Sequence, residues 1–190
     1  MRNLRIAIIA LSGVLALAGC GRGRQKSDTA ELILGTYNVG VFGKSGSNTT
    51  EMVASMMKEL GVQVLSLNEL DSCTVRHPEF QIKDFAEAMG EWNYNFAPAM
   101  DYQGGKYGIG TASSARLQPV RQYGITLDQA GGAEQRAMAV SVFDSFVFCS
   151  THLDHRSFEA QLSQARQICA WASANYGSRS EEHTSELQSH

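Results

Sequence analysis

The chain has 190 residues, of which 43% are hydrophobic and 18% charged, which suits one domain with a sizeable core and excludes a disordered chain. Its formal net charge of −3 gives no general attraction to nucleic acid. A phosphate-bearing ligand would therefore have to be held locally or through a metal ion.

The first 20 residues read as a secretory leader. Arg2 and Arg5 give a positive start, residues 6–17 form an apolar stretch too short for a membrane span, and the segment closes with Leu-Ala-Gly-Cys at Cys20. This ending resembles the lipobox of bacterial lipoproteins. We expect lipidation at Cys20 and a location at the cell envelope, in the outer membrane if the host is Gram-negative. An ordinary cleaved leader is the alternative.

Two polar segments flank the expected domain, which occupies residues 31–178. Residues 21–30 are polar and basic, as in a flexible tether. Residues 179–190 have no apolar period and look like a sequencing-adapter oligonucleotide translated in frame, with a genuine polar tail as the alternative. We therefore expect the native chain to stop, unfinished, at Ser178.

The first part of the domain alternates strands and helices. A strand is predicted over residues 32–39 with Asn38 near its end, then a helix over residues 50–60, then an apolar strand over residues 62–69 that ends at Glu69. This order is typical of a crossover unit, which brings the carboxyl ends of both strands to one sheet edge. A carboxylate there is costly unless it is paired or holds a cation, although Glu69 could simply cap the next turn.

Hairpins and two helices follow. Further strands are predicted over residues 94–98, 107–113, 119–127, 135–143 and 146–152, and helices over residues 82–89 and 157–174. The predicted buried faces are Val53, Met56, Met57 and Leu60 on the first helix, Ile82, Phe85, Ala86 and Met89 on the second, and Phe158, Leu162, Ala165, Cys169 and Ala172 on the last.

The expected fold class is α+β. We predict a mixed β-sheet with flanking helices on one face and the other face apolar and uncovered. This would be the first half of a four-layer α/β-sandwich whose second half is missing.

The apolar strand over residues 146–152 delivers His152 to its carboxyl end. A histidine there can hydrogen-bond or protonate a phosphate oxygen, and one satisfied by neighbouring backbone is the simpler alternative. Arg136, in Glu134-Gln-Arg136, offers a planar fork that suits phosphate, although most arginines on strands are solvated.

Zinc chemistry is the competing hypothesis. The segment from His152 to His155 matches the end of the His-x-His-x-Asp-His signature of metallo-β-lactamase-like hydrolases, but Ser150 replaces the first histidine. Cys73, Cys149 and Cys169 match no zinc spacing, and the sequence cannot pair them. We expect Cys149 and Cys169 to be small buried hydrophobes.

Several motifs together resemble the endonuclease/exonuclease/phosphatase superfamily. They are Thr36-Tyr-Asn38, Leu65-Ser-Leu-Asn-Glu69, Tyr107-Gly108, Glu134-x-Arg136, Thr151-His-Leu153 and Gln164-Ala165, in the expected order. Two departures are Gln161, where arginine is usual, and Thr111-Ala-Ser-Ser114, where Ile-Leu-Ser is common.

The resemblance implies a two-layer β-sandwich flanked by helices that hydrolyses phosphate esters with Mg²⁺, with Mn²⁺ or Ca²⁺ as alternatives. Glu69 would be the metal ligand, supported by Asn38; Asn38 and His152 would be catalytic; Arg136 and His152 would bind the phosphate. Nucleic acid, a phosphosugar or a phospholipid headgroup could be the substrate, and the lipid anchor would hold the protein at a membrane. No protein partner is evident.

Two later motifs of the superfamily, Gly-Asp-x-Asn and Ser-Asp-His, are absent from the sequence. We therefore expect this chain to be inactive and poorly folded, although the gene would encode a phosphoesterase. A non-catalytic surface lipoprotein that binds glycans or protein is the alternative from a different class.

Overall fold

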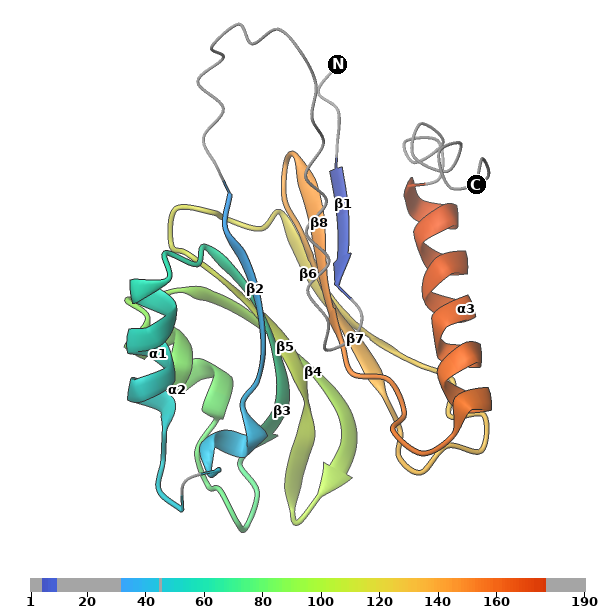
Figure 1. Cartoon of the computed structure of the whole chain (residues 1–190), viewed down its shortest axis with the longest axis horizontal. Coiled ribbons are helices and arrows are strands. Elements are labelled where there is room, and N and C mark those ends of the chain that lie inside the picture. Colours follow the sequence, from blue (N-terminus) through green and yellow to red (C-terminus); the bar gives the residue numbers. More distant parts are fainter. Residues whose placement is uncertain (1–4, 10–31, 45, 177–190) are drawn as a thin grey trace, which may run out of the picture.

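The computed structural model describes residues 5–9, 32–44 and 46–176 (Figure 1). The predicted lipidation site Cys20, the tether and the adapter-like tail lie outside these residues, so they stay predictions. The described part has an α+β fold with two four-stranded sheets and three α-helices, which confirms the predicted class.

Apart from β1 and the short turn η1, which the sequence did not predict, the elements follow the predicted order. The helices are η1 (Gly40–Phe42, a 3₁₀ turn), α1 (Thr50–Glu59), α2 (Gln81–Ala88) and α3 (Phe158–Tyr176). The strands are β1 (Arg5–Ile9), β2 (Leu34–Asn38), β3 (Val64–Ser72), β4 (Asn93–Tyr102), β5 (Gly105–Ser113), β6 (Arg121–Thr126), β7 (Ala137–Val142) and β8 (Phe146–Thr151).

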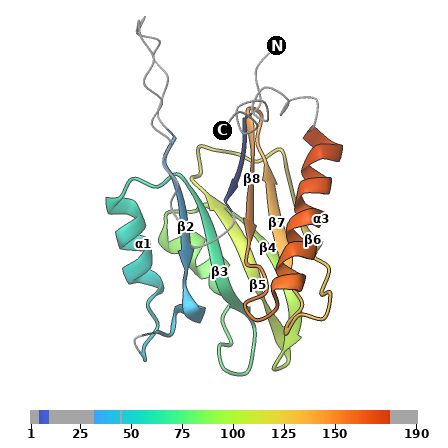
Figure 2. The same cartoon turned by 45° about the vertical axis from the view of Figure 1, so that its right-hand side comes forward.

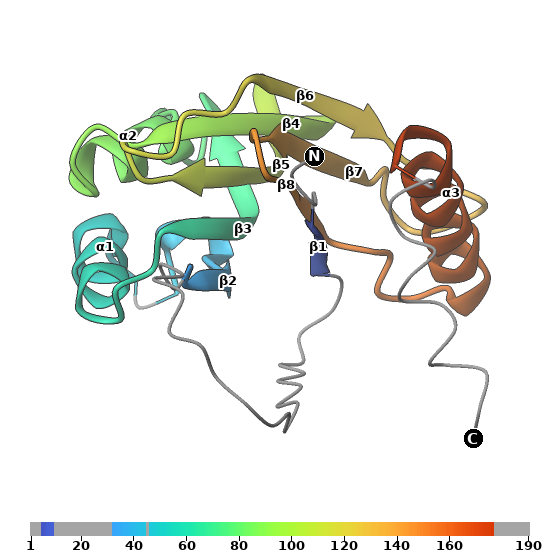
Figure 3. The same ribbon diagram turned by 90° about the horizontal axis from the view of Figure 1, so that it is seen from above.

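The layer arrangement differs from the prediction of one sheet with an uncovered face, which was wrong. One sheet has the order β2-β3-β5-β4 and the other β1-β8-β7-β6, and the two pack face to face. Helices α1 and α2 cover the outer face of the first sheet and α3 that of the second, as Figures 1 and 3 show. Small buried side chains on both inner faces, such as Ala97 and Ala139, allow the sheets to approach closely.

The inner layer changes character along the strands. At the amino end of β3, Val64 packs with Phe146 and Phe148. Further along, Ser66 and Ser150 form a buried hydroxyl pair at 2.7 Å that links the two sheets. The layer is therefore apolar at one end and hydrogen-bonded towards the carboxyl ends of β3 and β8.

The helix faces were predicted well for α2 and only partly for α1. All four residues predicted on α2 are buried. On α1, Val53 and Met57 are buried, but Leu60 is 60% exposed because it follows the last helical residue as the C-cap.

The predicted stripe on α3 was wrong. Phe158 is 77% exposed, and Cys169 is exposed rather than buried. The buried side chains are Ala160, Gln164 and Ile168 instead. The pattern of apolar residues does not locate the buried face of α3, because the polar Gln164 side chain is buried on that face and hydrogen-bonded.

Strand β1 pairs in parallel with β8 over five residues. It lies inside the predicted leader, and the structure does not test whether that leader is cleaved. Cleavage before Cys20 would remove β1 and leave β8 at the edge of its sheet (Figure 2).

The helices in the described ranges are not long and apolar enough to cross a membrane. Within the same ranges, Cys73, Cys149 and Cys169 form no disulfide. Burial raises the pKa of the Cys149 thiol to about 12, so this thiol is inert at neutral pH.

We predict that the Ser66–Ser150 pair couples the two sheets. Ser66→Ala should lower the free energy of unfolding by about 1–2 kcal/mol because it leaves the buried Ser150 hydroxyl with only its longer contact to Asn68 Oδ1 at 3.4 Å. The double replacement with Ser150→Ala should cost less than the sum of the two single ones. Urea unfolding measures these values, and Ser55→Ala on the exposed face of α1 is the control. Strict additivity would contradict the coupling.

Candidate active site

A β-bulge at Glu69 shapes one wall of the site. Glu69 has no pairing partner on β5, whereas Asn68 before it and Leu70 after it are both paired. Its φ is +61°, in the left-handed region that residues other than glycine rarely adopt. Regular alternation would place Glu69 beneath the helices beside Leu67, but the extra residue gives that place to the buried Leu70. The bulge therefore keeps the carboxylate out of the core.

Asn38 holds Glu69 in this position. Asn38 ends β2, and its Nδ2 donates a hydrogen bond of 2.6 Å to Glu69 Oε1. Its Oδ1 accepts from the Gly40 backbone N–H at 3.0 Å and from Lys44 Nζ at 3.2 Å. Because this oxygen already has two donors, the geometry favours Asn38 as the residue that orients Glu69 over a role as direct metal ligand. Lys44 has no sequence motif that would have revealed it.

A pocket of about 320 Å³ lies where the strand ends of the two sheets meet. Asn38 and Asn68 line it from β2 and β3, and His152 and His155 line it from the segment after β8. Residues predicted from distant parts of the chain thus converge on one edge of the sandwich. Glu69 and Arg136 are not among the lining residues and lie near them.

Charged residues from both sheets act on the pKa of His152, as expected if these residues converge. Burial lowers the pKa of His152, and the positive charge of Arg136 lowers it further. The Glu69 carboxylate acts in the opposite direction. His152 is therefore held in its neutral form at pH 7, with a charged residue of each sign nearby.

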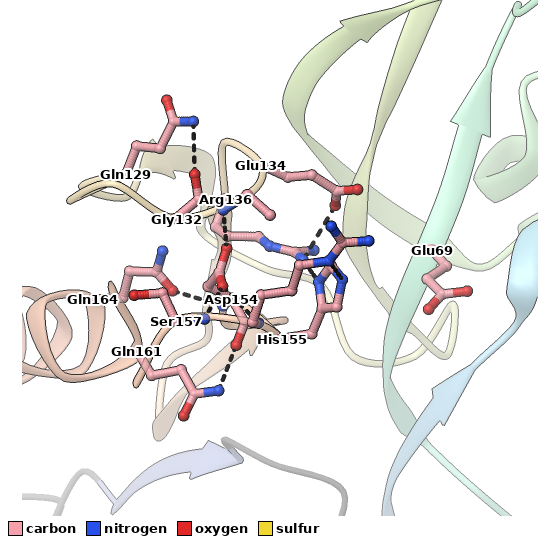
Figure 4. A network of polar contacts seen from close by, with 12 residues as sticks. Glu69, Gln129, Gly132, Glu134, Arg136, Asp154, His155, Ser157, Gln161 and Gln164 are labelled. Atoms are coloured by element: carbon pink, nitrogen blue, oxygen red, sulfur yellow. Dashed lines mark hydrogen bonds and ion pairs between the residues drawn. The ribbon is translucent and has the colours of Figure 1, made fainter. Parts of the chain in front are cut away.

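Arg136 is the buried centre of a polar network (Figure 4). Only 6% of its side chain is exposed, so the alternative of a solvated strand arginine is wrong, and phosphate binding by Arg136 stays a prediction. Its Nη2 contacts Glu134 Oε2 at 3.2 Å and His155 Nδ1 at 2.9 Å. Figure 4 shows Glu69 across from Arg136 and His155 on the neighbouring sheet.

The Asp154 carboxylate has a structural role, because it joins two loop segments through hydrogen bonds to their backbone N–H groups. Its Oδ2 accepts from the Ala133 N–H, and its Oδ1 accepts from the Arg156 and Ser157 N–H groups, each at 2.8 Å. Burial alone would raise the pKa of Asp154, but these backbone donors outweigh it and lower the pKa to about 2. A carboxylate occupied in this way is a poor zinc ligand, and Ser150 is buried in the sheet interface. Both observations disfavour the metallo-β-lactamase-like alternative.

Tyr107 lies near the Glu69 and Glu134 carboxylates. Burial raises the pKa of Tyr107 above its ordinary range, and the charges of Glu69 and Glu134 raise it further, so its hydroxyl stays protonated. Tyr107 was predicted only as part of a motif. Its proximity to Glu69 was not predicted, because it arises from the pairing of β3 with β5.

The donor set fits a hard cation held mainly by water and ligand. Among the described residues, no three His, Cys, Asp or Glu side chains are grouped to hold a metal ion. Mg²⁺ is commonly bound through one or two carboxylates, with waters and phosphate oxygens completing its coordination. Glu69 accepts a hydrogen bond from Asn38 at Oε1, and no described residue bonds to its Oε2, which suits that arrangement and not a zinc site.

Comparisons with known proteins identify the fold. A mannosyl-6-phosphatase from Bacteroides thetaiotaomicron matches with a TM-score of 0.63 and 15% identity, over 81% of this chain and 62% of its own. An endonuclease/exonuclease/phosphatase family protein from the same organism matches with a TM-score of 0.61 and 16% identity, over 76% and 57%. ANGEL2, a 2′,3′-cyclic phosphatase, matches with a TM-score of 0.54 and 13% identity, over 69% and 39%.

The chain thus has the fold of endonuclease/exonuclease/phosphatase proteins, as its motifs indicated. It spans about three fifths of the length of the first two structures. No protein-family model and no curated protein matches the sequence.

We predict that Glu69→Gln lowers the pKa of His152 further, because it removes the negative charge that opposes the effects of burial and Arg136. A titration of the imidazole resonances by NMR measures this. Glu51→Gln, an exposed change on α1, is the matched control. An unchanged His152 titration in Glu69→Gln would contradict the proximity of the two residues.

We also predict that glycine is better tolerated than alanine at the bulge. Glu69→Gly should be more stable than Glu69→Ala by about 1 kcal/mol, because glycine adopts positive φ without strain. Thermal and urea unfolding measure the difference. At Thr126, an exposed residue in β6, the same pair should show the reverse order. The same order at both sites would argue against strain at Glu69.

Proposed function

We propose that this chain is part of a metal-dependent phosphoesterase and carries its metal-binding and phosphate-binding residues. One observation carries the proposal: the Glu69 carboxylate, fixed by Asn38, and the buried Arg136 guanidinium both lie close enough to His152 to act on its pKa, at one edge of the sandwich. A carboxylate suits a hard cation, and a guanidinium suits a phosphate oxygen. The two halves of the site thus match the two charges of a metal–phosphate pair.

Each residue has a distinct role in this proposal. Glu69 holds Mg²⁺, with Mn²⁺ or Ca²⁺ as alternatives, and Asn38 orients its carboxylate. When bound, the metal ion neutralises negative charge on the phosphate. His152 donates its N–H to a phosphate oxygen, and Arg136 binds and orients the same group.

The activities of similar proteins support a phosphate ester as substrate. They include a mannosyl-6-phosphatase and a 2′,3′-cyclic phosphatase. Because this chain spans only part of their length and lacks Gly-Asp-x-Asn and Ser-Asp-His, we propose hydrolysis for a longer polypeptide. The 190-residue chain should bind metal ion without turnover.

The proposed location is the cell envelope, with the protein held by a lipid on Cys20. The support is the Leu-Ala-Gly-Cys sequence at the end of the apolar stretch.

Metal binding tests the proposal without requiring turnover. Mn²⁺ added to the chain should broaden the NMR signals of residues around Asn38, Glu69 and His152, and Mg²⁺ should reverse the effect. Glu69→Gln should weaken the binding about tenfold or more because it removes the anionic ligand. Glu51→Gln on α1 is the control and should bind as the parent chain does.

Broadening that is centred elsewhere, or that persists in Glu69→Gln, would reject the ligand assignment. Hydrolysis of p-nitrophenyl phosphate that depends on Mg²⁺ in the 190-residue chain would reject the expectation of inactivity.

A further inference from the structure

His155 lies between two arginines. Arg136 Nη2 approaches its Nδ1 at 2.9 Å, and Arg156 Nε approaches its Nε2 at 3.1 Å. A guanidinium only donates hydrogen bonds, and a neutral imidazole accepts at one nitrogen while the other carries a hydrogen. Only one of the two contacts can therefore be a hydrogen bond, and the other sets N–H against N–H.

Arg136 adds a second unmet donor. Its Nε is buried and has no hydrogen-bond partner, although 94% of the side chain is removed from solvent. The carboxylates around it offer no relief, because Glu134 contacts Nη2 and Asp154 is occupied by backbone N–H groups. The cluster therefore has more hydrogen-bond donors than acceptors and lacks an acceptor.

We infer that Arg136, His155 and Arg156 form a subsite for a terminal phosphate dianion, which makes phosphomonoesters the substrate class. This inference rests on the proposed function. A monoester carries about −1.5 to −2 charges at neutral pH and three acceptor oxygens, whereas a diester carries one charge. The two guanidinium groups have one partly exposed carboxylate, Glu134, beside them, and the Asp154 carboxylate is occupied by backbone N–H groups, so the remaining donors match the dianion better.

The location allows a ligand to reach this subsite. His155 lines the pocket with Asn38 and His152. His155 and Arg156 are exposed, and Arg136 forms the buried wall behind them. A phosphate oxygen in the pocket would accept the donors that now face each other.

Two small probes test the charge preference. Methyl phosphate and dimethyl phosphate are titrated into the full chain at pH 8 with a chelator present, and binding is followed by NMR. Methyl phosphate should bind about tenfold more tightly, as expected for one additional charge-assisted interaction. Arg156→Gln and His155→Gln should each weaken methyl phosphate binding about tenfold and change dimethyl phosphate binding little. Arg121→Gln, which alters an arginine stacked on Tyr123 in β6, is the control.

Equal affinity for the two probes would overturn the inference, as would unchanged methyl phosphate binding in Arg156→Gln. Arg156 is exposed, so this variant decides the matter even if His155→Gln fails to fold. The metal experiment is independent. Absence of Mn²⁺ binding in the parent chain, with the methyl phosphate preference retained, would reject the metal-dependent function and leave an anion site.

Discussion

The bulge at Glu69 is the constraint on which the proposed site depends. A strand with strict alternation would bury this carboxylate under α2, at a cost that no paired cation offsets there. The extra residue returns Leu70 to the core and leaves Glu69 within reach of Asn38. The strained backbone costs on the order of 1–3 kcal/mol, which the surrounding sheet and the Asn38 hydrogen bond must outweigh. The backbone conformation of Glu69 therefore affects both the stability of the fold and the geometry of the site.

Much of the fold could be predicted from local patterns. Each described α-helix and strand from residue 32 onwards lies where its apolar period and its glycines placed it, with ends shifted by a few residues, whereas the 3₁₀ turn η1 was not predicted. The two-layer β-sandwich that the resemblance implies is present, but the strand patterns alone predicted one sheet, because the packing of two sheets depends on small inner residues such as Ala97, which carry no local signal. The face of α3 was missed because Gln164, a polar residue, is buried through hydrogen bonds to the Asp154 N–H and the Asp128 carbonyl.

The candidate site was predictable only where a residue ends a strand. Asn38 and His152 stand at the carboxyl ends of β2 and β8, and such positions converge in sheets of this kind. The bulge was not predictable, because the sequence pattern of β3 reads as regular alternation through Glu69. The contact between His155 and Arg136 joins residues 19 apart whose side chains meet only after β7 and β8 have paired.

The direction of β2 has a consequence for a protein held at a bilayer. A lipid on Cys20 would precede the strand's start at Leu34, whereas the pocket is lined by the strand's last residues up to Asn38, about 13 Å from Leu34 in an extended strand. Ile33 and Leu60, at that start, are 40% and 60% exposed, an apolar surface that suits contact with lipid. An anchored domain would then present its pocket to the aqueous side. Such an orientation favours esters dissolved in water over the headgroups of the anchoring leaflet.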